Sequence, residues 1–280
     1  MANLPPKSGP SVADKRRAFH ELHKAGCFVI PNPWDVGSAR FLQSLGFKAL
    51  ATTSSGFAWS QGQPDGGSSR DQVLAHLHQL AAATDLPLNA DFESGYASDA
   101  AGVAESVRLA VDTGIAGLSI EDSTGDPAKP LYDLATALER LRAARKAIDK
   151  AGGDVLLVGR AENFLVGRPD LDDTIARLKA YSQAGADCLY APGIATPDQI
   201  RAIVTAVAPK PVNLLVGSAS KLTVQAISSL GVRRISVGGA LARSAWAAFM
   251  RTARSLAEQG QFDAFSDAAS GRELNSFFGK

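Results

Sequence analysis

The acidic residues with the clearest chemical potential follow short apolar runs of the sequence. Asp91 ends the run PLNAD, and Glu93 lies two residues beyond it. Glu121 ends the run GLSIE, and Asp65 lies in a Gly/Ser-rich loop after an earlier run. Carboxylates that lie close together resist ionisation unless a cation compensates their charge. If the fold gathers these four side chains, their oxygens predict a Mg²⁺ or Mn²⁺ site rather than a zinc site.

A second set of residues could bind a substrate near such a site. Arg160 ends the run VLLVGR and offers a planar fork for a carboxylate or phosphonate. The backbone N–H groups of Ser55 and Gly56 could hold an oxyanion, and Phe57 and Asn213 complete the predicted substrate-binding set. The structural alternatives are an ion pair for Arg160 and satisfaction of buried backbone for Asn213. Asp122 is as compatible with a cap or salt bridge as with catalysis.

The elements that must position these residues alternate along the chain. Eight short apolar runs are predicted as strands, at 27–31, 48–52, 87–91, 117–121, 155–160, 187–192, 211–215 and 234–238. Helical patterns follow them, at 35–45, 70–83, 99–112, 133–150, 171–183, 197–207, 220–229 and 240–258. Residues 54–69 are predicted as a functional loop, and residues 12–24 as an N-terminal helix. Continuously apolar strands are typical of a parallel sheet covered on both faces.

This alternation predicts a (β/α)8 TIM barrel, with a doubly wound open sheet as the alternative. Gly46, Gly114, Gly185 and Gly231 each end a helix shortly before a strand, as a C′ glycine does. A single barrel domain over residues 1–280, with a C-terminal helical tail, suits a fold that needs about 250 residues. Chemistry in such barrels lies at the carboxyl ends of the strands, where the residues named above are placed.

Composition excludes several classes of function. The chain has 29 Lys and Arg against 28 Asp and Glu, which argues against a broad nucleic-acid-binding face. No apolar run approaches the ~20 residues that cross a bilayer, and the N-terminus lacks a secretory signal. Two cysteines, Cys27 and Cys188, are too few for a disulfide framework. We therefore expect a cytoplasmic protein that binds neither membranes nor nucleic acid.

Several segments together resemble the isocitrate lyase/phosphoenolpyruvate mutase superfamily. They are PNPWDVGSARFLQSLGFKALATTSSG, PLNADFESGYAS, GLSIEDS, VGRAEN and RISVGGALARSAW. The resemblance runs from Cys27 to Phe262. It implies a (β/α)8 barrel whose eighth helix is exchanged between subunits of a homodimer or of a tetramer built from dimers.

The resemblance also implies roles for individual residues. The superfamily's D-x-D-x-G-Y motif matches residues 91–96, so Asp91 is implied as the direct Mg²⁺ ligand and Glu93 as a water-mediated one. Glu121, from the I-E-D motif, and Asp65, from the loop, are implied as further members of the metal site. Arg160 and the Ser55–Gly56 pair are implied to hold the substrate.

One segment departs from the superfamily's lyase pattern. Isocitrate and methylisocitrate lyases carry K-K-C-G-H after the fourth strand, and its cysteine is the catalytic acid/base. Here the loop reads STGDPAKPLYD, without cysteine or histidine. Those two activities are not expected, and Tyr190, Lys129 or a metal-bound water is left as the proton carrier. The resemblance is therefore to the phosphonomutase-like and oxaloacetate decarboxylase-like branches.

These observations support three hypotheses. The first is a Mg²⁺-dependent lyase or decarboxylase that acts on a small α-oxo or α-hydroxy carboxylate through a metal-bound, pyruvate-like enolate. The second is P–C bond chemistry of the phosphonopyruvate hydrolase or phosphoenolpyruvate mutase type, with Lys129 as a second cation. The third is a non-catalytic homologue that binds a ketoacid.

Overall fold

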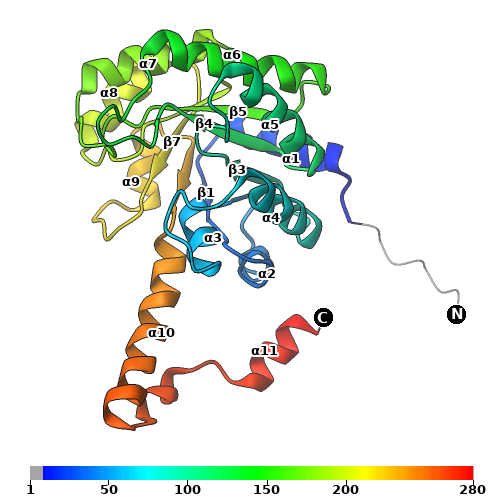
Figure 1. Cartoon of the computed structure of the whole chain (residues 1–280), viewed down its shortest axis with the longest axis vertical. Coiled ribbons are helices and arrows are strands. Elements are labelled where there is room, and N and C mark those ends of the chain that lie inside the picture. The colour runs from blue at the N-terminus through cyan, green and yellow to red at the C-terminus, as the bar shows by residue number, and fades with distance from the viewer. Residues whose placement is uncertain (1–8, 280) are drawn as a thin grey trace, which may run out of the picture.

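The computed structural model describes residues 9–279 and shows a barrel of eight parallel strands (Figure 1). The strands are β1 Phe28–Ile30, β2 Leu50–Ala51, β3 Leu88–Asp91, β4 Gly117–Glu121, β5 Leu156–Arg160, β6 Cys188–Tyr190, β7 Val212–Leu215 and β8 Arg234–Ser236. Their order in the sheet is β1-β8-β7-β6-β5-β4-β3-β2. The predicted (β/α)8 TIM barrel is confirmed.

The barrel closes between β1 and β2 without a regular ladder. The N–H of Ala51 donates to the carbonyl of Pro31 at 3.1 Å, just beyond β1. The side chain of Asn32 adds a bond from its Nδ2 to the carbonyl of Thr52 at 2.8 Å. These two bonds take the place of the ladder, so the sheet is nearly closed.

Helices surround the strands. The helices of the barrel are α1 Val12–Lys24, α2 Val36–Ser44, α3 Ser54–Ser60, α4 Arg70–Ala83, α5 Ala100–Asp112, α6 Leu134–Lys150, α7 Leu171–Gln183, α8 Pro197–Val207 and α9 Val224–Ser229. Local sequence explains their bounds: Asp35 and Asp99 accept N-cap bonds from Ser38 and Gly102. The four predicted C′ glycines all have φ between +84° and +104°, a region open to glycine at little cost.

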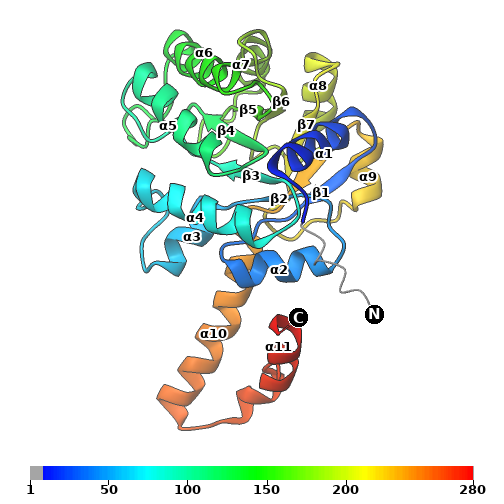
Figure 2. The ribbon, with the colours of Figure 1, turned by 90° about the vertical axis from the view of Figure 1, so that its right-hand side faces the viewer.

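Helix α1 closes the amino-terminal end of the barrel (Figure 2). Phe19 is fully buried there in a cluster with the strand residues Leu156 and Val158. Arg16 donates from Nε to the carbonyl of Ile115 at 2.9 Å, two residues before β4. With one end of the barrel closed, a ligand has access from the carboxyl ends of the strands.

Two predicted segments differ in the structure. Residues 54–60, expected in a loop, form α3, because Thr53 caps the helix and Phe57 and Ala58 bury one face of it. The helix predicted at 220–229 begins only at Val224, because Thr223 is its N-cap. The first change matters for function, since it turns a predicted loop into a helix whose amino end lies at the site.

The C-terminal segment leaves the barrel. Helix α10 Ala240–Gln259 extends away from the strands, and η1 Asp263–Asp267 and α11 Gly271–Phe278 lead back toward α2 (Figures 1 and 2). Only Ala242 of α10 is buried. The predicted exchange of this helix between subunits stays a prediction, and residues 1–8 and 280 of the predicted domain lie outside the described residues.

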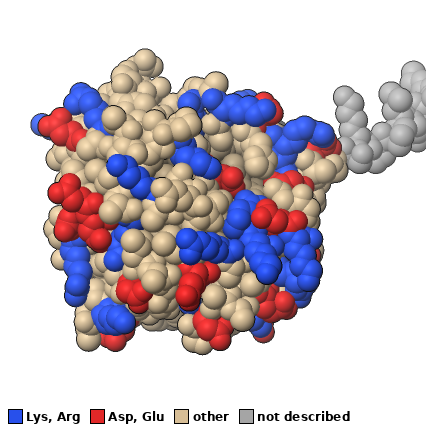
Figure 3. Space-filling model, turned by 90° about the horizontal axis from the view of Figure 1, so that it is seen from above, with Lys and Arg blue, Asp and Glu red and all other residues tan. Residues whose placement is uncertain are grey.

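The outer surface carries charges of both signs. On the face that includes α6 and α7, Lys and Arg are interspersed with Asp and Glu (Figure 3). Within residues 9–279, no helix is long and apolar enough to cross a membrane.

Candidate active site

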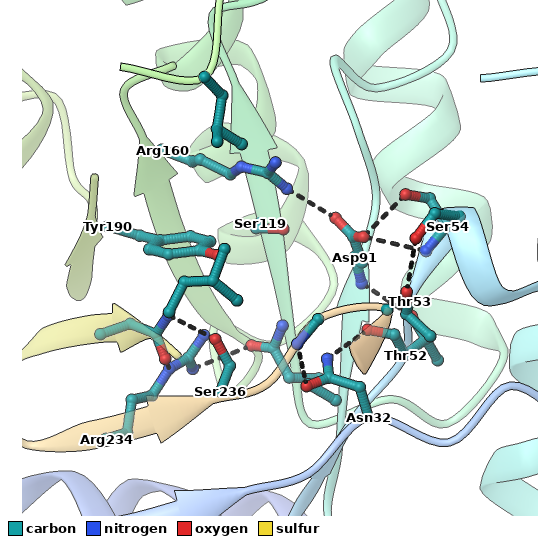
Figure 4. Close-up of a pocket in the computed structure, with 18 of the residues that line it drawn as sticks. Asn32, Thr52, Thr53, Ser54, Asp91, Ser119, Arg160, Tyr190, Arg234 and Ser236 are labelled. Carbon is teal, nitrogen blue, oxygen red and sulfur yellow. Dashed lines mark hydrogen bonds and ion pairs between the residues drawn. The ribbon is translucent and has the colours of Figure 1, made fainter. Parts of the chain in front are cut away.

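A cavity of about 170 Å³ opens at the carboxyl ends of the strands (Figure 4). Residues from β2, β3, β4, β5, β6, β7 and β8 contribute to its lining. They include Asn32, Thr52, Ser54, Ser55, Asp65, Asn89, Asp91, Ser119, Arg160, Tyr190, Asn213, Arg234 and Ser236. This is the end of the barrel where catalytic residues are found in other proteins of this fold.

Asp91 is the most fully positioned acid of the cavity. Its Oδ2 accepts from the N–H and the hydroxyl of Ser54, at 3.0 and 2.9 Å (Figure 4). Its Oδ1 accepts from Nη1 of Arg160 at 3.0 Å. The amino end of α3 therefore holds this carboxylate from one side and Arg160 from the other.

Arg160 lies among three carboxylates. Its Nη1 is 3.0 Å from Asp91 and 3.1 Å from Glu121, and its Nε donates to Glu162. These partners come from β3, from β4 and from the second residue after β5, so the strand register brings them together. Arg160 is therefore paired within the protein, and its predicted role in holding a substrate stays a prediction.

Negative charge at the mouth still exceeds the positive charge. Burial raises the pKa of Glu93 to about 7, and the charges of Asp91 and Asp65 add to the effect. Burial also raises the pKa of Asp65, Glu121 and Glu162 above their ordinary values. Five carboxylates around one arginine are the charge imbalance that an added cation would relieve.

The loop after β3 holds Glu93 in an uncommon conformation. Glu93 and Tyr96 have backbone φ values of +46° and +53°, which residues other than glycine rarely adopt. The hydroxyl of Tyr96 donates to Oε1 of Glu93 at 2.8 Å. Such strain persists where the surroundings enforce it, often at functional sites. Here it directs Glu93 toward the acidic mouth.

The residues present fit a divalent cation by their chemistry. Within residues 9–279, no three His, Cys, Asp or Glu side chains converge in a metal-holding arrangement, and Asp91 and Glu121 pair with Arg160. Yet Asp65, Asp91, Glu93 and Glu121 do gather at one mouth, and all their donors are oxygens. Mg²⁺ keeps several waters and needs only one or two carboxylates directly, so this set suits it.

The structure places two predicted substrate-binding residues away from the cavity lining. Gly56 is buried and its N–H donates to the hydroxyl of Thr53 at 3.3 Å, as part of the helix cap. Phe57 packs instead on His76 of α4, with the rings stacked at 4.0 Å. Helix formation at 54–60 is the reason, since it directs alternate sides of this segment to the cavity and the core. Ser55 does line the cavity.

The remaining predicted residues differ in their positions. Tyr190 lines the cavity, with Cζ of Arg160 at 5.2 Å from the centre of its ring. Asn213 lines the cavity too, but its Oδ1 accepts from Arg234 and its Nδ2 donates to Ser236. Lys129 is exposed and does not line this cavity.

Two groups gain importance only from the structure, and the role of a third becomes clear. Glu162 and Arg234 were not among the predicted site residues, although a charge inside or beside an apolar strand was a usable signal. Asp122 is resolved as structural: it is buried, pairs with Arg177 at 3.1 Å and accepts from the hydroxyl of Tyr181 at 2.5 Å.

A parallel (β/α)8 barrel with buried, charged side chains at its carboxyl-end mouth is the architecture of an enzyme. The sequence profile of the phosphoenolpyruvate phosphomutase family matches residues 19–257. The chain belongs to this family, within the isocitrate lyase/phosphoenolpyruvate mutase superfamily.

Relatives with named activities differ among themselves. An oxaloacetate decarboxylase of Paraburkholderia xenovorans is 30% identical over 71% of this chain and 67% of its own length. A 2-methylisocitrate lyase of Escherichia coli is 33% identical over 64% of this chain and 62% of its own length. Among solved structures, a candidate lyase/mutase from Burkholderia cenocepacia is 47% identical, with a TM-score of 0.93 over 96% of this chain and 98% of that chain. The superfamily thus supports an enzyme, while its members' reactions diverge.

Proposed function

We propose that this protein is a Mg²⁺-dependent carbon–carbon lyase or decarboxylase that acts on a small α-oxo or α-hydroxy carboxylate. The observation that carries the proposal is the acidic mouth, where Asp65, Asp91, Glu93 and Glu121 gather in excess of one arginine. The relatives that decarboxylate oxaloacetate or cleave 2-methylisocitrate support the same class of reaction.

Asp91 would hold the cation directly, with Asp65, Glu93 and Glu121 around it through water. When bound, Mg²⁺ polarises a substrate oxygen and offsets negative charge that develops on it. Mn²⁺ would serve the same role with the same ligands.

The chain's own residues orient the reacting groups. Ser54 and Arg160 hold the two oxygens of Asp91, so this carboxylate is fixed before substrate arrives. Ser55, at the amino end of α3, lines the cavity, where its backbone N–H would favour an anionic oxygen.

Tyr190 is the group best placed to move a proton. Burial raises its pKa to about 12, against the opposing charge of Arg160. The phenol is therefore neutral near pH 7 and can donate a proton to a product carbanion rather than accept one from substrate. Lys129 is a weaker candidate because it is exposed on the loop after β4.

P–C bond chemistry is the second candidate function, favoured by the family to which the chain belongs. The loop after β4 contributes Ser123, Thr124 and Gly125 to a neighbouring cavity beside the acidic mouth. Lys129 would have to move toward that cavity to assist a phosphonate. Binding of a ketoacid without turnover is the third candidate.

The deciding experiment follows the products by proton and phosphorus NMR. The protein is incubated with oxaloacetate, 2-methylmalate or phosphonopyruvate, each with Mg²⁺ and with EDTA. Pyruvate formed above the metal-catalysed background supports the lyase or decarboxylase, and EDTA should abolish the enzymatic share. Phosphate or phosphoenolpyruvate would favour the second candidate, and tight Mg²⁺-dependent binding without any product the third.

Asp91→Ala is the active-site control for this assay. We expect its rate to fall to the metal-catalysed background, because the direct metal ligand is lost. Asp126→Ala removes an exposed carboxylate from the loop after β4 and is the matched variant that should retain activity. Equal rates for Asp91→Ala and wild type would contradict the proposal.

We also propose that the protein acts as a homo-oligomer, either a dimer or a tetramer. The exposed helix α10 supports this proposal. We further propose that the protein acts in the cytoplasm on a small carboxylate, without nucleic-acid or membrane partners.

A further inference from the structure

Arg140 of α6 is a buried cation that lies outside the cavity. The residue is only 2% exposed, and it lines neither the cavity nor the acidic mouth beside it. Within residues 9–279, no ion pair includes it. The ring of Tyr132 lies 4.4 Å from its Cζ. A buried charge without a paired anion is costly, so the groups to which it donates indicate its purpose.

All the hydrogen bonds of Arg140 go to backbone carbonyls of one segment, the loop after β3. Its Nη2 donates to the carbonyl of Ser94 at 2.6 Å and to that of Ala97 at 2.8 Å. Its Nη1 donates to the carbonyl of Ser98 at 3.1 Å. Residues 94–98 belong to no helix or strand. One side chain from the outer helix layer therefore supplies the donors that regular structure would otherwise give these carbonyls.

The two carbonyls bound by Nη2 follow the two strained residues of this loop. Ser94 comes directly after Glu93, whose φ is +46°. Ala97 comes directly after Tyr96, whose φ is +53°. Because a peptide unit is planar, a bonded carbonyl fixes the orientation of its whole unit. A single nitrogen thus stabilises both uncommon turns of the loop that carries Glu93.

Glu93 depends on this loop more than the other acids of the mouth do. The carboxylate of Asp91 is held by Ser54 and Arg160, and Glu121 lies within the ladder of β4. Among the described residues, the carboxylate of Glu93 accepts only from the hydroxyl of Tyr96, which belongs to the same loop. The conformation of the loop backbone therefore decides where this carboxylate lies.

We infer that Arg140 is a positioning residue, which holds the loop after β3 so that Glu93 faces the cation proposed for the acidic mouth. This inference rests on the proposed function. It adds to the metal site a residue that contacts neither the cation nor the substrate and acts through Glu93.

The test measures Mn²⁺ binding, so that it does not depend on turnover. Free Mn²⁺ is followed by electron paramagnetic resonance as the full-length wild type, Arg140→Gln, Glu93→Gln and the double variant are titrated. Asp91→Ala identifies the share of binding that belongs to the mouth. Arg16→Gln is the matched control, because Arg16 is also buried and donates to two backbone carbonyls, but at the amino-terminal end of the barrel.

We expect Arg140→Gln to weaken Mn²⁺ binding about 10-fold, as for the loss of a group that orients a metal ligand. In the Glu93→Gln background the same substitution should change the affinity little, since Arg140 acts through Glu93. Arg16→Gln should bind Mn²⁺ like the wild type, even where it lowers stability. An unchanged affinity in Arg140→Gln, or an equal loss with and without Glu93, would overturn the inference.

Hydrogen exchange without metal gives a second readout. The N–H of Gly95 donates to the carbonyl of Phe92 at 2.9 Å, inside the loop. Peptides that cover residues 92–98 should exchange faster in Arg140→Gln and at the wild-type rate in Arg16→Gln. Equal exchange in Arg140→Gln and wild type would contradict the inference. A wild type that binds no Mn²⁺ would instead refute the proposed metal site, and the exchange rates would still decide whether Arg140 holds the loop.

Arg140→Lys keeps the test valid if Arg140→Gln does not fold. Lysine retains the charge but has one nitrogen and no planar fork, so it cannot reproduce all three bonds. Its Mn²⁺ affinity should be lower than that of the wild type, again only where Glu93 is present. A wild-type affinity in this variant would count against the inference.

Discussion

At the residue scale, identical side-chain types have opposite environments in this protein. Arg160 is ringed by Asp91, Glu121 and Glu162, whereas Arg234 has only neutral partners. Asp91 lines the cavity, whereas Asp122 forms an ion pair with Arg177 and accepts a hydrogen bond from Tyr181. Residue type therefore identifies candidates, and the partners decide which of them remain free to act on a ligand.

The role of Tyr190 gives a prediction at this scale. We expect Tyr190→Phe to lower kcat by about 100-fold or more, the usual range for loss of a general acid, with KM changed only a few-fold. Phenylalanine keeps the ring beside Arg160, so the packing is preserved. Steady-state kinetics on the substrate identified by NMR would measure both constants.

Tyr132→Phe is the control for this prediction, because Tyr132 packs on Arg140, outside the cavity. A Tyr190→Phe enzyme with wild-type kcat would show that another group delivers the proton.

At the element scale, α3 links the site to the barrel's outer layer. Its amino end bonds to Asp91 through Ser54, and its buried face stacks Phe57 on His76 of α4. His76 is buried, and its Nε2 has no hydrogen-bond partner among the described residues. The position of α3 thus depends on an imidazole that stays neutral.

This burial predicts a dependence of stability on pH. Burial lowers the pKa of folded His76 to about 4, against the opposing charge of Asp35 and an ordinary value of about 6.5. Between pH 6.5 and pH 4, His76 is protonated in the unfolded chain and stays neutral in the folded chain. The share of stability from His76 is therefore complete above pH 6.5 and falls by about 1.4 kcal/mol per pH unit toward pH 4.

Urea unfolding of wild type and His76→Phe at pH 7, 6 and 5 checks this prediction. As pH falls, the wild type should lose more free energy of unfolding than His76→Phe. The titration of the carboxylates is common to both proteins and cancels in the difference. His78→Phe, at an exposed position of the same helix, controls for the added ring. Parallel curves for wild type and His76→Phe would contradict the prediction.

At the scale of the whole molecule, the C-terminal segment stands apart from the barrel. Trp246, Phe249, Met250 and Leu256 lie at helical spacing along α10 and are all exposed, Phe249 by 61%. An apolar stripe of this kind is typical of a face that packs against another surface. We propose that the surface is a second copy of this chain.

Oligomeric mass tests this proposal. Size-exclusion chromatography with light scattering should give a multiple of the chain mass of 29.2 kDa for the wild type. Phe249→Glu should shift the protein toward the monomer, because it places a charge in the apolar stripe. Arg251→Glu, on the opposite side of α10, should leave the mass unchanged; a monomeric wild type would refute the proposal.

Much of the architecture was determined by the sequence alone. Apolar runs that alternate with helical patterns, and the glycines that end helices at Gly46, Gly114, Gly185 and Gly231, predicted the barrel and most element bounds. Because all strands of such a barrel point the same way, the residues at their carboxyl ends had to share one mouth. This reasoning placed Asp65, Asp91, Glu121 and Arg160 at that mouth. It needs only the local sequence pattern, since that pattern shows where each strand ends.

Only the tertiary structure decided which charges neutralise one another. Two partners of Arg160, Asp91 and Glu121, come from the neighbouring strands β3 and β4, and their distances depend on strand register and side-chain rotamer rather than on sequence neighbours. The same is true of Arg234: alternation along β8 directs it inward, but the absence of a facing acid is a property of the other strands. Phe57 was misplaced for a related reason, since the Thr53 cap and the burial against His76 turned an expected loop into α3.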